Sequence, residues 1–134
     1  MALSWNEIQV TWSSNPSIDL VMYSGQTSDE INPSAAAVQS QIQLKADHSG
    51  TPGSEDIVEF WLLQTLGDPD GSGGDEYDTD EQAHLLAVLN TYEDDPALTT
   101  VPLPLPQKNA RLLAKNLSFS TITVSATVLE QVST

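Results

Sequence analysis

The alternation of hydrophobic and polar positions is clearest near the C-terminus. Between residues 121 and 128 the apolar positions are Ile122, Val124, Ala126 and Val128, and Thr or Ser fills the others. A period of two is typical of a strand with one buried face, and Val and Thr suit a pleated surface. Another apolar run, residues 110–116, precedes this strand, and residues 115–118 resemble a turn. We therefore predict a C-terminal β-hairpin.

Three further segments have hydrophobic patterns that predict strands. Residues 38–46 alternate between apolar and polar positions, which indicates an amphipathic strand. Residues 57–66 form the most hydrophobic run and are apolar on both faces, as expected of a central strand. Residues 83–92 fit either a strand or a helix, and we favour the strand because the neighbouring segments are strands.

These patterns predict an all-β fold. Turn-rich segments separate about seven or eight strands at intervals of roughly 10–15 residues, which favours a single antiparallel β-sandwich, jelly-roll or immunoglobulin-like. A chain of 134 residues is long enough for one domain with a real core. We expect residues 1–16 to form an N-terminal arm or edge strand and residues 17–134 to form the sandwich, with a long acidic hairpin loop.

The expected arm carries apolar side chains in an otherwise polar sequence. These residues are Trp5, Ile8, Val10 and Trp12. Either they cover the core of their own domain or they anchor the chain to a neighbouring molecule, because Trp is enriched among the residues that dominate interfaces. We take all four as candidate partner-binding residues.

The charge of the chain excludes several classes of partner. It has 19 acidic and four basic residues, a net charge of −15. Nucleic acids and anionic membranes both need Lys and Arg on the protein, so we expect neither as a partner. The chain has no apolar run of about 18 residues, which predicts no transmembrane helix, and its first residues lack the pattern of a signal peptide. Cysteine is absent, which removes disulfides and thiolate metal sites.

The long acidic loop, residues 67–81, is the strongest candidate for a metal site. Its candidate ligands for Ca²⁺ are Asp68, Asp70, Asp75, Glu76, Asp78 and Asp80. Residues 68–73 match the first half of an EF-hand loop, but position twelve is Thr79 and not a bidentate Glu. The loop is therefore a weak Ca²⁺ site, a solvated acidic tip or a docking segment for a partner. We expect no other cofactor.

The sequence lacks a convincing catalytic constellation. His48 and His84 lie in different contexts, and neither has the spacing of a zinc site or an evident pair of partners for a catalytic triad. The clustered carboxylates lie on one loop without a groove that would hold a sugar for hydrolysis. We therefore expect a protein without enzymatic activity.

The layout of the chain resembles small bacteriophage virion proteins of the head decoration (cement) type. The resemblance consists of the apolar run at residues 58–67, an Asp-Pro-Asp-Gly turn, a proline-bearing crossover, and residues 110–116 followed by the alternating terminal strand. It covers about residues 38–130. It implies a non-enzymatic structural protein on the outer surface of the head, where copies of the chain, as homotrimers, bind the major capsid protein and bridge its subunits.

An alternative function is a Ca²⁺-dependent carbohydrate-binding or adhesin module, for example of a phage tail. In that case Trp5, Trp12 or Trp61 would provide the flat surface on which a sugar ring packs. Both hypotheses describe acidic β-sandwiches with exposed aromatic side chains, and the sequence does not separate them.

Overall fold

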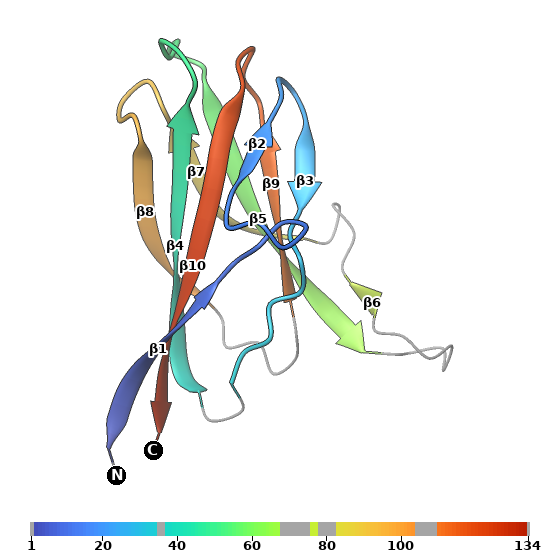
Figure 1. The fold of residues 1–134 in the computed structure, drawn as a ribbon, viewed down its shortest axis with the longest axis vertical. Coiled ribbons are helices and arrows are strands. Elements are labelled where there is room, and N and C mark those ends of the chain that lie inside the picture. Colours follow the sequence, from blue (N-terminus) through green and yellow to red (C-terminus); the bar gives the residue numbers. More distant parts are fainter. Residues whose placement is uncertain (1, 35–36, 68–75, 78–82, 104–109, 134) are drawn as a thin grey trace.

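The protein is an all-β sandwich of two antiparallel sheets, as the alternation predicts (Figure 1). A computed structural model describes residues 2–34, 37–67, 76–77, 83–103 and 110–133. Every regular element within these residues is a strand. In this described part, no helix is long and apolar enough to cross a membrane.

The first sheet is built around the long C-terminal strand. Its order is β1 (Leu3–Gln9), β10 (Ile122–Ser133), β4 (Ala37–His48) and β8 (Ala97–Leu103). The short strand β2 (Ile18–Leu20) also pairs with β10. The register of β10 on β4 extends from Ile122 opposite His48 to Val132 opposite Ala37. β10 therefore joins both ends of the molecule.

The second sheet is built around the hydrophobic run that predicts a central strand. Its strands are β3 (Gly25–Thr27), β9 (Ala110–Asn116), β5 (Ile57–Gly67), β6 (Glu76–Tyr77) and β7 (His84–Asn90). β5 pairs with β9 on one side and with β6 and β7 on the other, which confirms its central position. Residues 83–92 contain strand β7, as favoured over the helix.

The core lies between the two sheets. The first sheet contributes the predicted inner face of β10, and the second contributes the inner face of β5. These inward-facing side chains are nearly or fully inaccessible to solvent: Ile122, Val124, Ala126, Val128, Val58, Phe60 and Leu62. The faces deduced from the period-two pattern are therefore correct.

The predicted C-terminal hairpin is wrong. β9 lies in the second sheet and β10 in the first, so the two strands do not pair and residues 117–121 cross between the sheets. Each strand has a fully buried face, with Leu112 and Ala114 in β9 and Ile122 and Val124 in β10. Because the two strands lie in opposite sheets, their apolar faces border the same core and cover each other. In a hairpin both strands would belong to one layer, and their apolar faces would not cover each other.

The N-terminal segment is an edge strand and not a free arm. β1 pairs with β10 from Leu3 opposite Ser133 to Gln9 opposite Thr127. The Val10 amide continues the pairing by donating to the Ala126 carbonyl at 3.0 Å. The chain then turns at residues 12–15 and enters β2. Residues 2–16 therefore belong to the first sheet and its immediate connection.

Candidate functional site

Four connections between strands gather at one end of the sandwich, opposite the two chain termini (Figure 1). We call this the loop end, and its connections are residues 21–24, 49–56, 91–96 and 117–121. Each connection passes from one sheet to the other and so forms an arch. The order of their strands in the second sheet, β3-β9-β5-β7, sets the order of the arches: 21–24, 117–121, 49–56 and 91–96.

The first two arches carry a group of exposed hydrophobic side chains. We call this group the apolar patch; it consists of Val21, Met22, Tyr23, Leu117 and Phe119. Phe119 is 75% exposed and Tyr23 is 57% exposed. Their rings meet edge to face, with centroids 5.0 Å apart and an interplanar angle of 79°. Gathered apolar side chains on the surface of an acidic protein indicate an interaction site.

The buried amide of Asn116 holds these two arches together. Its Nδ2 donates to the carbonyls of Leu20 and Ser120, both at 2.8 Å, and to that of Val21 at 3.2 Å. Its Oδ1 accepts from the Ser118 amide at 2.9 Å. Because a buried, fully used amide tolerates few alternative geometries, Asn116 fixes the backbone beneath the apolar patch.

Further backbone contacts set the direction of Tyr23. Its φ of 53° is in the left-handed region, which a non-glycine residue adopts mainly in tight turns. The Tyr23 amide donates to the Ser118 carbonyl at 3.3 Å, and the Ser24 hydroxyl donates to the Val21 carbonyl at 2.7 Å. These contacts close the turn and leave the phenol ring outside it.

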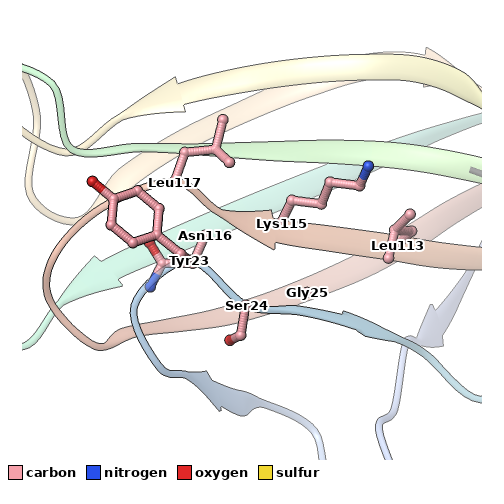
Figure 2. A pocket seen from close by; sticks show the side chains of 7 residues that line it. All are labelled: Tyr23, Ser24, Gly25, Leu113, Lys115, Asn116 and Leu117. Carbon is pink, nitrogen blue, oxygen red and sulfur yellow. The ribbon is translucent and has the colours of Figure 1, made fainter.

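A pocket of about 370 Å³ continues from the apolar patch along the outside of the second sheet (Figure 2). It is lined by Tyr23, Ser24, Gly25, Leu113, Lys115, Asn116 and Leu117. Figure 2 shows Tyr23 and Leu117 at one end and Leu113 at the other, with Lys115 between them. Gly25 permits a close approach of β3 to β9, because a Cβ there would lie 3.3 Å from the Ala114 carbonyl oxygen.

Lys115 connects the pocket to a half-buried tryptophan on the central strand. Its Nζ lies 5.5 Å from the centre of the Trp61 ring, within the range of a cation–π interaction. Trp61 Nε1 donates to Glu59 Oε1 at 3.3 Å, and Glu59 lies opposite Lys115 in the register of β5 and β9. The pocket lining therefore contains one basic side chain, and its border is aromatic and polar.

The other two arches are acidic. Their exposed carboxylates are Glu55, Glu93, Asp94 and Asp95, and Tyr92 is exposed beside them. Asp56 and Asp95 also have structural roles. Asp56 Oδ2 lies 2.8 Å from Nε2 of the buried His48, and Asp95 Oδ1 accepts from the His48 amide at 3.0 Å.

His48 has a structural role in this arrangement. The Gly50 amide donates to its Nδ1 at 2.9 Å, so Nδ1 carries no proton and Nε2 donates to Asp56. The ring is buried and both nitrogens are used. His84 is exposed on β7. The structure therefore does not bring the two histidines into a common site.

The four predicted partner-binding residues of the N-terminal segment are separated by the fold. Trp5 is exposed on β1, and Ile8 is partly buried against the core. Val10 and Trp12 are in the core at 1% and 2% exposure, so their assignment as partner-binding residues is wrong. They come directly after β1 in the chain and enter the interior, because removal of their apolar surface from water stabilises the fold.

The predicted Ca²⁺ ligands lie almost entirely outside the described residues. The predicted ligands outside the described residues are Asp68, Asp70, Asp75, Asp78 and Asp80. The sixth, Glu76, lies within strand β6. Among the residues that the structure describes, no three His, Cys, Asp or Glu side chains are grouped so as to hold a metal. The Ca²⁺ site stays a prediction.

Sequence reasoning did not select the apolar patch. Residues 18–23 have the pattern of a strand, but β2 ends at Leu20 and Tyr23 lies in the following arch. Phe119 lies between the predicted turn at residues 115–118 and the alternating segment, and β10 begins at Ile122. The available signal was a single Phe between Ser118 and Ser120, outside the alternating segment that begins at residue 121.

Comparisons with known proteins identify the fold and no family. No protein-family model matches the chain, and no curated protein matches it. The structure is similar to the N-terminal endo-1,4-β-D-xylanase 10B of Clostridium thermocellum, CBM22-1–GH10 modules complexed with xylohexaose, with a TM-score of 0.54 at 9% identity. This match covers 96% of the present chain and 28% of the xylanase chain.

A second similar structure is a GH115 4-O-methyl-α-glucuronidase with specificity for decorated arabinogalactans. The TM-score is 0.44 at 14% identity, and the match covers 94% of this chain and 16% of the glucuronidase chain. The chain thus spans less than a third of either protein. At such low identity, the first match supports the β-sandwich class and nothing finer.

Proposed function

We propose that the protein is a non-enzymatic structural component of a bacteriophage virion, of the head decoration type, that docks on the outer shell through its loop end. The observation that carries this proposal is the apolar patch, which is exposed on an otherwise strongly acidic chain and rests on a fixed backbone. The location on the virion and the major capsid protein as the partner are inferred from the resemblance of the sequence layout to decoration proteins.

The energetics of such docking suit a repeated shell. Exposed side chains such as Phe119 and Tyr23 lose contact with water when a partner covers them, and this contributes roughly 25 cal/mol for each Å² of apolar surface. A patch of five side chains gives a modest single contact. Copies that also bind one another, as the expected homotrimer, would convert modest contacts into stable attachment through avidity.

Cosedimentation with shells tests this proposal. Shells are assembled from the coat protein encoded in the same genome, mixed with the full chain and pelleted. We expect the wild-type chain to pellet and Tyr23→Ser/Phe119→Ser to stay in solution. Trp5→Ser is the matched control, because Trp5 is exposed to a similar degree at the opposite end. A wild-type chain that never pellets, or a double variant that pellets equally well, would overturn the proposal.

Carbohydrate binding is a second candidate function, favoured by the pocket. Tyr23 supplies an aromatic ring, and Lys115 and Ser24 supply polar groups within the same lining. The likeness to a fold solved with xylohexaose makes that oligosaccharide a rational first probe. Calorimetric titration with xylohexaose, followed by a glycan array with Ca²⁺ or a chelator, tests it. Binding that Tyr23→Ala abolishes would support this candidate, and a flat titration and array would remove it.

A further inference from the structure

We propose that the loop end recognises a basic protein segment, in which one apolar anchor side chain is flanked by Lys or Arg. This inference rests on the proposed docking through the apolar patch and names the chemistry of the partner segment. The apolar anchor would enter the pocket beside Tyr23 and Leu117. The basic side chains would lie over the two acidic arches.

The charges of the loop end are divided sharply between its halves. The four arches contain five carboxylates and no Lys or Arg. All five carboxylates, Glu55, Asp56, Glu93, Asp94 and Asp95, are in residues 49–56 and 91–96. The arches that carry the apolar patch contain none. A partner that covers the whole loop end therefore meets an apolar half and a negative half.

The two halves form one continuous surface. The Ser49 amide donates to the Thr121 carbonyl at 3.1 Å, which ties the first acidic arch to the arch of Phe119. The Leu117 amide donates to the Ile57 carbonyl at 3.0 Å beside the same junction. The second acidic arch is fixed to the first because the Thr91 amide donates to the Asp56 carbonyl at 3.1 Å. A single peptide segment can therefore contact both halves.

The pocket and the acidic arches favour different side chains of the partner. The pocket has apolar side chains at both ends, Tyr23 and Leu117 at one and Leu113 at the other, so the anchor is a neutral apolar or aromatic side chain. The exposed carboxylates of Glu55, Glu93 and Asp94 attract cations and have no Lys or Arg within their own arches. Apolar burial would supply most of the affinity, and charge complementarity would supply orientation and selectivity.

Synthetic peptides provide the direct test. The probe is a flexible Gly/Ser peptide with one Phe and four Lys on one side of it. The control peptides replace Phe by Ser, or every Lys by Glu. We measure the dissociation constant by fluorescence anisotropy at low and at moderate salt, since screening over a Debye length of about 10 Å at 0.1 M should weaken the charged contacts. We expect the Phe/Lys peptide to bind more tightly than either control and to weaken with salt.

Variants of the full chain locate the two contributions. Neutralising the acidic arches by Glu55→Gln/Glu93→Gln/Asp94→Asn should raise the dissociation constant roughly tenfold at low salt and remove most of the salt dependence. The three substitutions are also made one at a time. The control for these single variants is Glu7→Gln, which removes one exposed charge from β1, away from the arches, and should have no effect. An unchanged affinity in the triple variant, or equal binding of the Lys and Glu peptides, would overturn the inference.

Cosedimentation of the triple variant with shells separates this inference from the proposed function. If the wild-type chain and the triple variant both pellet equally with shells, docking stands and recognition of a basic segment is wrong. If the wild-type chain binds the Phe/Lys peptide through the patch but never pellets with shells, the inference stands and the virion role is wrong.

Discussion

The two ends of the sandwich both expose aromatic side chains, but only the loop end supports them as a group. At the loop end, Phe119 and Tyr23 contact each other above arches that Asn116 fixes. At the terminal end, Trp5 and Leu3 are both exposed on the edge strand β1, where Trp5 lies opposite Gln131. The difference shows that exposure of an aromatic residue is insufficient to define a site. At the loop end, a contact between two rings and a fixed backbone accompany the exposure.

A buried polar side chain organises each end, with different consequences. Glu130 has no exposed surface; it accepts from Asn6 Nδ2 at 3.0 Å and from the Ser34 amide at 2.8 Å. It thereby fastens β1 and the segment before β4 to β10. The side chains of β1 are mostly polar, so the hydrogen bonds of Glu130 hold a polar edge strand in place. Asn116 instead secures arches whose side chains are apolar and exposed, which is the arrangement expected of a docking surface.

The largest effect is expected where the two ends share one strand. Val124 is fully buried in β10, which pairs with β2 toward the loop end and with β1 toward the termini. Val124→Asp places an unpaired charge in the core and should cost more than about 4 kcal/mol, enough to unfold both ends together. Circular dichroism and thermal unfolding measure this. Ser125→Asp, on the outer face of the same strand and opposite Lys45, should stay folded. A folded Val124→Asp protein would contradict the assignment of the faces.

A matched pair of tryptophans sharpens the contrast between core and surface. Trp12 is 2% exposed and Trp5 is 55% exposed. Trp12→Ala should therefore lower the free energy of unfolding by about 3–5 kcal/mol, because it removes a large buried side chain and leaves a cavity. Trp5→Ala should change the free energy of unfolding by less than about 0.5 kcal/mol. Urea unfolding of both variants checks this, and similar losses would mean that β1 packs more closely than the structure indicates.

The loop end alone should respond to a change at Asn116. In Asn116→Asp, the donor of three backbone hydrogen bonds becomes an acceptor that faces the same carbonyls, which should cost about 2–3 kcal/mol. Urea unfolding measures the loss, and amide exchange should increase in residues 20–24 and 117–121 before it increases in β1. Asn32→Asp, at an exposed position, is the control and should be close to neutral. An equal increase at both ends would mean that Asn116 stabilises the whole sandwich and not the arches.

The sequence predicted the strands better than their partners. Alternation in residues 122–128 identified the buried face correctly, because a period of two depends only on burial. The apolar run in residues 57–66 identified the central strand. The pairing of β9 was missed because the choice between a hairpin and a crossing arch depends on the opposite sheet. The apolar patch was missed for the same reason. Phe119 and Tyr23 are almost a hundred residues apart, and only the fold brings their rings together.

The smallest effect concerns the turn that joins β1 to the body. In this turn Ser13 and Ser14 have φ of 48° and 68°, and the Asp29 carboxylate accepts from the Ser14 amide at 2.8 Å, from the Thr11 hydroxyl at 2.8 Å and from the Ser13 amide at 3.2 Å. The hydrogen bond from Ser14, followed by that from Thr11, holds the pKa of Asp29 below its ordinary value of 3.8.

A lowered pKa makes the contribution of Asp29 depend on pH in a defined direction. The carboxylate stabilises the folded state fully above its unfolded pKa of 3.8, and this stabilisation is lost as the pH falls through the lower pKa of the folded state. Asp29→Asn should therefore be less stable than wild type near neutral pH, and the difference should shrink in acid below the unfolded value. Urea unfolding of both proteins across this range measures it, with Glu7→Gln as the control for loss of one charge. A difference that is constant with pH would mean that the carboxylate charge does not stabilise the turn, and the join of β1 to the body would then depend on packing alone.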